Sequence, residues 1–179
     1  MSAPLQLVGP EEELEESYLS FIADMKDRGE KIWEAFLPRP GESFSDFVNH
    51  LKSAESSPEP GQVMTTTYWA MLGEVVVGRI SIRHELTDDL RDFGGHIGYE
   101  VRPTARKKGV ATEMLRLALR TPAARKIEKV LLTCAPDNIA SNRTIQKNGG
   151  LLAGSKFVAR VQRQTNYYWI DVSAREPCS

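Results

Sequence analysis

The stretch HIGYEVRPTARKKGVAT, residues 96–112, decides the fold. Residues 96–102 carry β-branched and aromatic side chains and predict a strand, which Pro103 ends. A short basic loop leads to Gly109, where a helix is expected to begin and to run to Arg120 with its apolar residues on one face. The start of a helix presents unpaired backbone N–H groups and a partial positive charge, which together suit a phosphate group. The spacing therefore predicts a strand, an anion-binding turn and a helix in direct succession.

The residues of this loop separate it from two other kinds of phosphate loop. A Walker loop needs Gly-Lys followed by Ser or Thr, whereas Gly109 is followed by Val110. A dinucleotide fingerprint needs Gly-x-Gly-x-x-Gly, and here only Gly109 is available. A nucleotide-dependent kinase or oxidoreductase is therefore disfavoured. Gly109 and the small Ala111 let a ligand approach the backbone closely. An ordinary strand–helix turn with solvated lysines is the alternative interpretation.

Hydrophobic periodicity organises the rest of the chain into one mixed α/β domain. Helices are expected over residues 11–27, after the capping Ser43, and over residues 137–148. The expected strands cover residues 5–8, 65–72, 74–84, 130–134, 152–161 and 165–172. Residues 86–95 are expected to be an irregular connection. This order predicts helices over a central sheet, with hairpin connections and a short parallel portion at the strand–helix units.

Composition and charge narrow the class of protein. The chain has 179 residues, of which 41% are hydrophobic, and a net charge of −1. These values indicate one globular domain, and they give no reason to expect a nucleic-acid or membrane partner. No apolar segment is long enough to span a bilayer and no basic leader is evident, so we expect a cytoplasmic protein. Cys134 is expected in a buried strand, Cys178 is next to last, and neither a disulfide nor a metal site is expected.

The loop resembles a motif of the Gcn5-related N-acetyltransferase (GNAT) superfamily. Arg106-x-x-Gly109-x-Ala111 is similar to the pyrophosphate loop of that family. The preceding residues 99–103 are similar to the strand that leads into the loop. The likeness covers residues 65–172 well, is vague before them, and extends to a bacterial subgroup of expected acetyltransferases.

A second motif follows after a helix and a strand, as in the same family. Asn138-x-x-Ser141, with Lys147-x-Gly149 behind it, is similar to the family pattern Asn-x-x-Ser…Lys-x-Gly. Two motifs in the right order and at the right separation are much more specific than either alone.

The resemblance implies a fold and a cofactor. The fold is a mostly antiparallel central sheet of about seven strands with about four flanking helices. Its fourth and fifth strands splay apart, and the pantetheine arm of acetyl-CoA lies between them. Backbone bonds to that arm are implied for Tyr99 and Val101. Asn138 is expected to bind pantetheine, or to cap its helix, or both. The pyrophosphate is expected on the loop Arg106, Lys107, Lys108, Gly109, Val110, Ala111 and Thr112.

The implied reaction moves an acetyl group to a primary amine of a small molecule or peptide, directly, in a ternary complex. Such a reaction needs a base, because amines of lysine type are protonated at neutral pH. Glu100 is expected to be that base, since it lies on the strand beside the thioester. If its side chain faces the other way, it is a solvated or ion-paired residue. His84 and His96 are alternatives, as bases or as hydrogen-bonded structural residues.

A proton donor for the leaving thiolate is less evident. Many family members carry Tyr seven residues after the helix Asn, and this chain has Ile145 there. Ser141 lies one helical turn earlier on the same face and is expected to bond the sulfur or a bridging water, or to act as a second capping hydroxyl. The missing Tyr favours an alternative function, a non-catalytic acyl-CoA sensor or interaction module.

The N-terminal part is expected to serve the acceptor. Residues 1–62 would form the acceptor side and residues 63–172 the cofactor-binding core of the single domain 1–179. The acidic residues 11–16 would attract a cationic acceptor or simply begin a helix. Tyr167 to Trp169 would form a homodimer seam if they are exposed. Four aromatic residues would line the acceptor site or belong to the core, namely Trp33, Phe36, Phe44 and Phe47.

Overall fold

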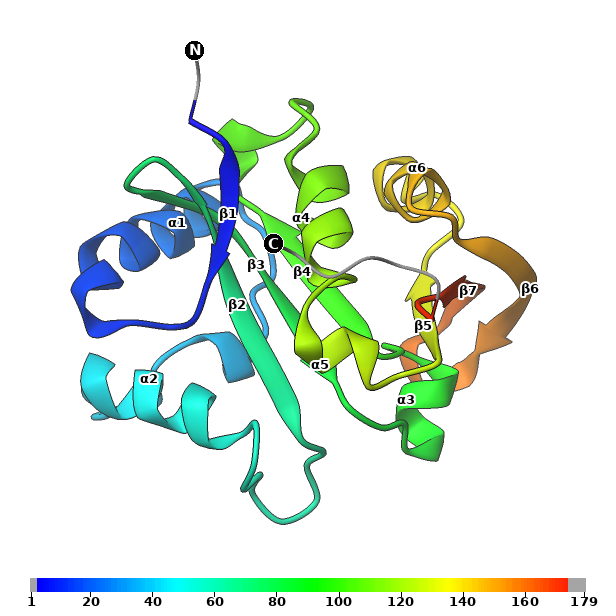
Figure 1. Ribbon diagram of the computed structural model, residues 1–179, viewed down its shortest axis with the longest axis horizontal. Helices are drawn as coiled ribbons and strands as arrows, with labels where there is room; N and C mark the ends of the chain where they lie inside the picture. Colours follow the sequence, from blue (N-terminus) through cyan, green and yellow to red (C-terminus); the bar gives the residue numbers. More distant parts are fainter. Residues whose placement is uncertain (1–2, 174–179) are drawn as a thin grey trace.

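The computed structural model describes residues 3–173. Its strands form two antiparallel sheets (Figure 1). The first sheet has the order β1-β2-β3-β4, with β1 (Leu5–Val8), β2 (Thr65–Leu72), β3 (Val75–Arg83) and β4 (Ile97–Val101). The second has the order β5-β7-β6, with β5 (Lys129–Cys134), β6 (Leu151–Val158) and β7 (Arg163–Asp171). The expected strands are therefore confirmed, within a few residues at each end.

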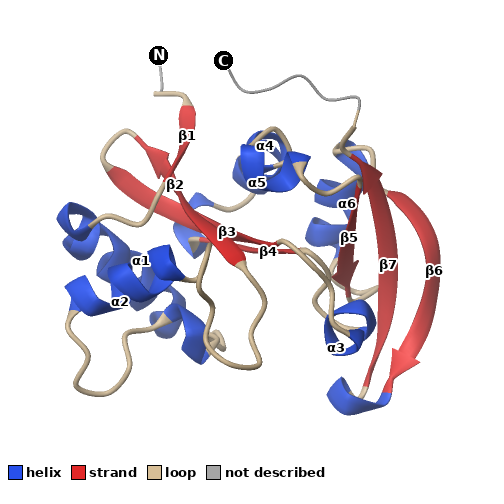
Figure 2. Ribbon diagram, turned by 60° about the horizontal axis from the view of Figure 1, so that its bottom comes forward, coloured by secondary structure: helices blue, strands red, loops and turns tan. Residues whose placement is uncertain are grey.

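Helices cover both faces of the first sheet (Figure 2). One face is covered by α1 (Glu15–Asp27) and α2 (Phe44–Ser53), and the other by α4 (Val110–Ala118). The last long helix, α6 (Ile139–Lys147), packs against α4 and β5. Short helices are α3 (Asp88–Asp92) and α5 (Pro122–Arg125), and single 3-10 turns are η1 (Glu12–Leu14), η2 (Glu34–Phe36), η3 (Pro103–Ala105) and η4 (Ala159–Val161).

Among residues 3–173, the backbones of the two sheets pair at one point only. Gly95 forms an isolated antiparallel bridge with Leu132, and the His96 N–H donates to the Leu131 carbonyl at 2.8 Å. The Leu131 N–H donates in return to His96 Nδ1 at 2.9 Å. Beyond this bridge β4 and β5 do not pair, which is the splay that the resemblance implied. The expected short parallel portion is wrong for the described residues, because the only link between the two strands is this antiparallel bridge.

Gly95 makes the junction possible. Its φ is +65°, and a Cβ there would lie 2.4 Å from the Leu131 carbonyl oxygen. A side chain would therefore clash with the β5 backbone and also strain its own. The close approach of the two sheets depends on this glycine.

Two hydrophobic cores lie on opposite faces of the first sheet. Successive residues of a strand point to opposite faces, so Trp69 joins the core under α1 and α2, and Ala70 joins the core under α4. Tyr18 of α1 stacks on Trp69, with ring centroids 4.3 Å apart. Phe44 and Phe47, expected either at an acceptor site or in the core, are buried in the same cluster.

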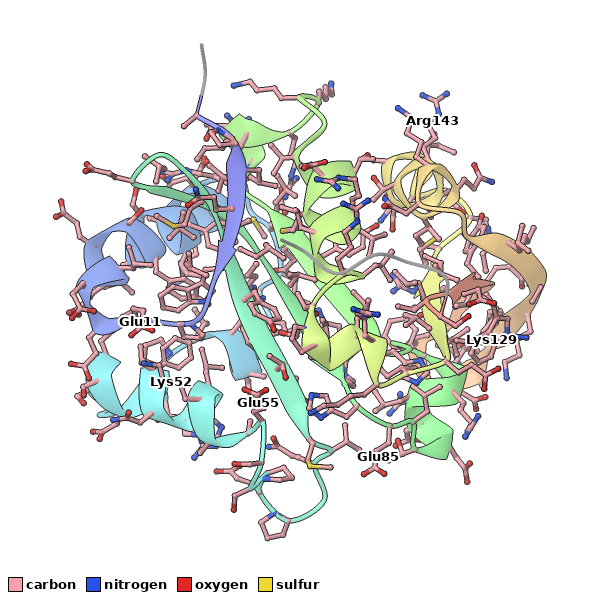
Figure 3. The ribbon with its side chains drawn as sticks, viewed as in Figure 1. Glu11, Lys52, Glu55, Glu85, Lys129 and Arg143 are labelled. Carbon is pink, nitrogen blue, oxygen red and sulfur yellow. The ribbon has the colours of Figure 1, made fainter. Side chains whose placement is uncertain are left out.

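Side-chain caps and ion pairs fix the helices locally. The hydroxyl of Ser43 accepts the Asp46 N–H at 3.1 Å, so the expected cap of α2 is confirmed. Glu11 pairs with Lys52 at 2.8 Å and ties the start of α1 to α2, and Figure 3 shows the two side chains facing each other. The acidic run therefore contributes to packing between the two helices, and this contact explains Glu11 without a ligand.

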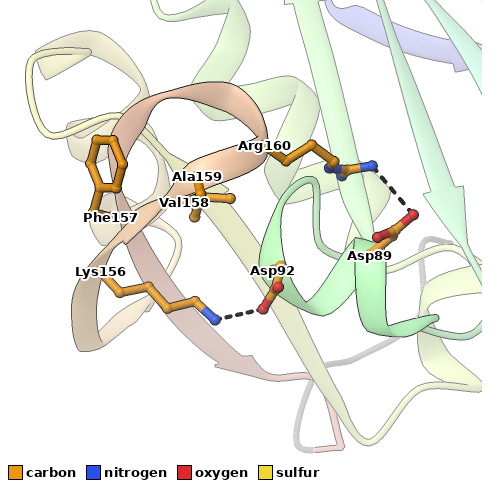
Figure 4. A pocket seen from close by; sticks show the side chains of 7 residues that line it. All are labelled: Asp89, Asp92, Lys156, Phe157, Val158, Ala159 and Arg160. Carbon is orange, nitrogen blue, oxygen red and sulfur yellow. Dashed lines mark hydrogen bonds and ion pairs between the residues drawn. The ribbon is translucent and has the colours of Figure 1, made fainter.

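The short helix α3 lies in a stretch that was expected to be irregular. The hydroxyl of Thr87 caps it by accepting the Leu90 N–H at 3.3 Å, a local signal that the sequence did contain. Asp92 pairs with Lys156 at 2.5 Å and Asp89 pairs with Arg160 at 3.3 Å, across a shallow pocket between α3 and the end of β6 (Figure 4). The charged side chains of this pocket are thus already partnered.

Candidate cofactor and acceptor sites

The turn before α4 has the backbone that an anion site needs. Gly109 has φ +81° and is the N-cap of α4, without a side-chain hydrogen bond at the cap. Lys107 also has a positive φ, +62°. None of the backbone N–H groups from Lys107 to Thr112 has an acceptor in the part of the chain that the structure describes. A Cβ on Gly109 would meet no atom within 4 Å, so the space beside the turn at Gly109 is open. This arrangement fits a pyrophosphate group.

The side chain of Arg106 turns away from this turn. Its Nε donates to the Val101 carbonyl at 2.9 Å, and its Nη2 binds Glu30 Oε2 at 2.7 Å. The side-chain charge of Arg106, a residue expected on the pyrophosphate loop, is therefore paired with a carboxylate just after the end of α1. The exposed Lys107 and Lys108 keep their expected place on the loop.

The open edge of β4 lies next to this turn. The bonds from Arg83 N to the His96 carbonyl and from Arg102 N to the Val77 carbonyl set the hydrogen-bond alternation between β3 and β4. Because antiparallel bonding alternates along a strand, the polar backbone groups of Tyr99 and Val101 point away from β3, into the gap toward β5. The family resemblance implied backbone bonds from these two residues to the pantetheine arm. The gap leaves the edge of β4 free to make such bonds.

Two hydroxyl groups meet across the gap between β4 and α6. Tyr99 Oη and Ser141 Oγ lie 2.9 Å apart. Burial raises the pKa of the Tyr99 phenol to about 12, against the smaller opposing effect of its bond to Ser141. The phenol therefore keeps its proton at neutral pH. The sequence-based expectation concerned only the backbone of Tyr99, because strand alternation does not show which helix its side chain faces.

Residues of the second motif, on α6, bind and pack against other parts of this chain. Asn138 caps the helix by accepting the Ser141 N–H at 3.1 Å, so the capping alternative is confirmed. Ile145, at the position where many relatives have Tyr, is fully buried in the core under α4. Cys134 is buried and free, as expected, and lies beside Ser141. Cys178 lies outside the described residues.

Glu100 faces the side of the sheet that α1 and α2 cover. Its Oε2 accepts two bonds from Arg79, from Nη2 at 2.6 Å and from Nε at 3.2 Å. The side chain of Arg79 is 2% exposed and that of Glu100 is 20% exposed. Glu100 is thus ion-paired, as in the alternative given for it, and its role as the base stays a prediction. Sequence reasoning missed Arg79, although an arginine inside an otherwise apolar strand was a visible signal.

The two histidines have structural partners. His96 is 7% exposed, and burial, with Arg91 and Arg83 adding smaller effects, lowers its pKa to about 4. Its Nδ1 accepts the Leu131 N–H, so it joins the sheets as a neutral ring. His84 Nε2 lies 2.8 Å from Thr66 Oγ1, and burial together with Lys126 lowers its pKa. Both therefore correspond to the structural alternative.

The described residues include no group of three or more His, Cys, Asp and Glu side chains that could hold a metal ion. None of the helices in residues 3–173 is long and apolar enough to cross a membrane. What the fold does provide is an open strand edge beside a turn of free N–H donors. That combination would suit an extended ligand that carries phosphate groups.

Comparison with known families identifies the ligand class. Residues 6–150 match the family model described as an acetyltransferase (GNAT) domain. The chain therefore belongs to the GNAT family of acetyltransferases, whose donor is acetyl-CoA. A comparison with curated protein sequences finds no match.

Several solved structures share the fold. The ribosomal L7/L12 α-N-protein acetyltransferase RimL in complex with coenzyme A is 20% identical, with a TM-score of 0.65 over 98% of this chain and 100% of that one. The microcin C7 self-immunity acetyltransferase MccE, in complex with acetyl-CoA and AMP, is 19% identical, with a TM-score of 0.61 over 93% and 92%. A variant of the spermidine N-acetyltransferase SpeG from Vibrio cholerae is 14% identical, with a TM-score of 0.59 over 95% of each chain. At these identities the likeness establishes the fold alone.

Proposed function

We propose that this chain transfers an acetyl group from acetyl-CoA to a primary amine of a small molecule or peptide, directly, in a ternary complex. The C–S bond of the thioester breaks, the C–N bond of the amide forms, the amine gives up a proton, and coenzyme A leaves as the thiol. The observation that carries this proposal is the row of free backbone N–H groups from Lys107 to Thr112 beside the open edge of β4. These donors suit a pyrophosphate, and the strand edge suits a pantetheine amide chain.

The chain's own groups have distinct proposed roles. Loop residues 107–112 hold the phosphates through their backbone N–H groups, and Tyr99 and Val101 orient the extended arm. Glu100 accepts the proton of the amine on its Oε1, which has no hydrogen bond to any described residue, while Arg79 holds Oε2. The Tyr99 phenol and the Ser141 hydroxyl hold a proton near the leaving sulfur, in place of the Tyr that Ile145 replaces.

The acceptor side is proposed to be the face of the first sheet beneath α1 and α2, within residues 1–62. Two structural neighbours, by their names, act on the amines of a ribosomal protein and of spermidine. For this chain an amine acceptor is proposed, together with a cytoplasmic location. A homodimer seam at Tyr167–Trp169 has less support, since Tyr168 is 2% exposed and its two neighbours are half-buried.

A second candidate function is a non-catalytic acyl-CoA sensor. Ile145 favours it, because this buried isoleucine cannot donate a proton from the position where many family members carry Tyr. Release of free coenzyme A separates the two functions. An acetyltransferase releases thiol in the presence of an amine, whereas a sensor binds acetyl-CoA without turnover.

The first experiment is calorimetric titration of acetyl-CoA into the wild type and the Gly109→Glu variant. The new carboxylate would stand in the open space before the N–H donors, and we expect binding to weaken about 100-fold or more. Gly73→Glu is the matched control, because Gly73 also has a positive φ, +60°, with no atom within 4 Å of a Cβ, in the β2–β3 turn. Circular dichroism checks that both variants fold.

The control should bind acetyl-CoA as the wild type does. Absence of binding in the wild type would overturn both the acetyltransferase and the sensor. Equal binding by wild type and folded Gly109→Glu would place the cofactor elsewhere. If binding is confirmed, thiol release is then measured over a panel of primary amines.

A further inference from the structure

Three side chains stand in a row across the first sheet, on the face that α1 and α2 cover. The strand registers place Trp69 opposite Arg79, and Arg79 opposite Glu100. Directly opposite residues of antiparallel strands project from the same face, so these side chains are neighbours. Trp69 is 0% exposed and Arg79 is 2% exposed. A tryptophan N–H, a guanidinium and a carboxylate thus lie side by side beneath the two helices.

This row has more hydrogen-bond donors than acceptors. Arg79 donates Nε and Nη2 to Glu100, but its Nη1 is buried and has no partner among the described residues, and the same is true of Trp69 Nε1. Buried donors without partners are rare in folded proteins, because each has lost its bond to water and gained none. A guanidinium has five N–H donors in a fixed plane, so the unbonded Nη1 is held in place by the two bonds to Glu100. The row therefore lacks an oxygen that could accept from Nη1.

The short turn η2 lies over the guanidinium of Arg79. The ring of Phe36 lies over the guanidinium, and Tyr18 Oη donates to the Phe36 carbonyl at 2.9 Å. Phe36 belongs to η2, which is the only regular element in the connection from α1 to α2. Displacement of Phe36 would open this face of the guanidinium next to Glu100.

We propose that Arg79 binds an oxygen of the acceptor through Nη1, and that it thereby selects amines with a carbonyl or carboxylate oxygen close to the nitrogen. This inference rests on the proposed function, in which the reacting amine lies at Glu100. The chemical class is then the α-amine of a peptide or of an amino-acid amide. The amine lies against the carboxylate, and the neighbouring carbonyl accepts from the guanidinium. Phe36 leaves the face of Arg79 when this acceptor enters.

A polyamine suits the row poorly. Its chain has no oxygen, so it leaves Nη1 without a partner, and its further ammonium groups meet the positive guanidinium at short range. A site built around a hydrogen-bond donor discriminates strongly against an analogue that lacks the acceptor, because the donor stays buried and unbonded. The row thus distinguishes between two kinds of amine that proteins of this fold use.

The test compares acceptors that differ in oxygen content. The values of kcat/KM are measured for alanylalanine amide, spermidine and hexylamine, each corrected for its fraction of free amine. We expect the wild type to favour the peptide amide by about 100-fold or more over both oxygen-free amines. The same three compounds are titrated calorimetrically into the complex with coenzyme A, which reports binding even in the absence of turnover.

Variants separate recognition from folding. Arg79→Met removes the guanidinium, and Arg79→Lys keeps the charge but loses the planar fork. Arg83→Met is the matched control, since Arg83 lies on the same strand and its Nη1 donates to the Gly95 carbonyl at 3.1 Å. General loss of structure lowers kcat/KM for every acceptor alike. Loss of the proposed contact moves the ratio between peptide amide and hexylamine toward one.

Each outcome decides the proposal. A ratio that falls in both Arg79 variants and persists in Arg83→Met supports it. A wild type that prefers spermidine or hexylamine overturns it, even if the variants do not fold. An unchanged ratio in folded Arg79→Met overturns it as well. Binding of the peptide amide without thiol release would refute the acetyltransferase but keep the contact, so the two failures are distinguishable.

Discussion

Tyr99 of β4 and Ser141 of α6 share a 2.9 Å hydrogen bond across the gap between the two sheets. The bond joins a phenol that keeps its proton to the hydroxyl at the start of the helix that Asn138 caps. The pair offers two exchangeable protons in a chain that has Ile145 where many relatives have Tyr.

We expect Tyr99→Phe to lower kcat by about 100-fold while the affinity for acetyl-CoA changes little, because the substitution removes a proton donor and leaves the backbone contacts in place. Ser141→Ala should have a similar effect. The double variant should be no worse than the worse single variant, since both hydroxyls act through one bond. Steady-state kinetics and calorimetry measure the two quantities. Fully additive losses would contradict the coupling.

His96 should make stability depend on pH. Its pKa is about 4 in the folded protein, below its ordinary value of 6.5, so the unfolded chain binds more protons between these two values. Stability is therefore complete above pH 6.5 and falls as the pH drops toward 4, by up to about 3 kcal/mol. The free energy of urea unfolding, measured from about pH 7 to about pH 4, should fall less steeply in His96→Asn. Parallel pH profiles would show that His96 titrates alike in both states.

Gly95→Ala should destabilise the protein far more than Gly73→Ala. Both glycines have positive φ values, +65° and +60°, so backbone strain is similar in the two variants. Only at Gly95 would the new Cβ also clash with the Leu131 carbonyl oxygen, and we expect about 2 kcal/mol of additional destabilisation. Denaturant unfolding measures the difference. Equal losses would mean that the junction between the sheets yields easily.

Arg106→Ala should lower stability more than it weakens the binding of acetyl-CoA. The side chain bonds Val101 and Glu30 and leaves the phosphate turn to backbone groups. We expect a loss of about 1 kcal/mol in unfolding free energy and less than about a tenfold change in Kd. Glu30→Gln should show part of the same loss of stability. A large effect of Arg106→Ala on Kd without a stability loss would assign the guanidinium to the cofactor.

The sequence by itself determined the order of the strands and long helices, the turn before α4 and the two family motifs. These features depend on residues that are close in the chain: Pro103 and Gly109 bound the loop, and Asn138 caps the helix of the second motif. Local backbone preferences and the period of apolar residues are sufficient for them. The short helices α3 and α5 escaped prediction because five and four residues are too few for a periodic signal.

Only the tertiary structure decided which side chains meet. The alternation of a strand shows that Tyr99 and Glu100 face opposite sides, but not which side carries the helices α1 and α2. The partners of Glu100, Arg106 and Tyr99 come from β3, the segment after α1, and α6, between 21 and 76 residues away in the chain. Such contacts depend on how the sheets and helices pack. Hydrophobic periodicity indicates which face of an element is buried, but not which residues of other elements it contacts. The contacts of Arg79 and the Tyr99–Ser141 bond therefore became visible only in three dimensions.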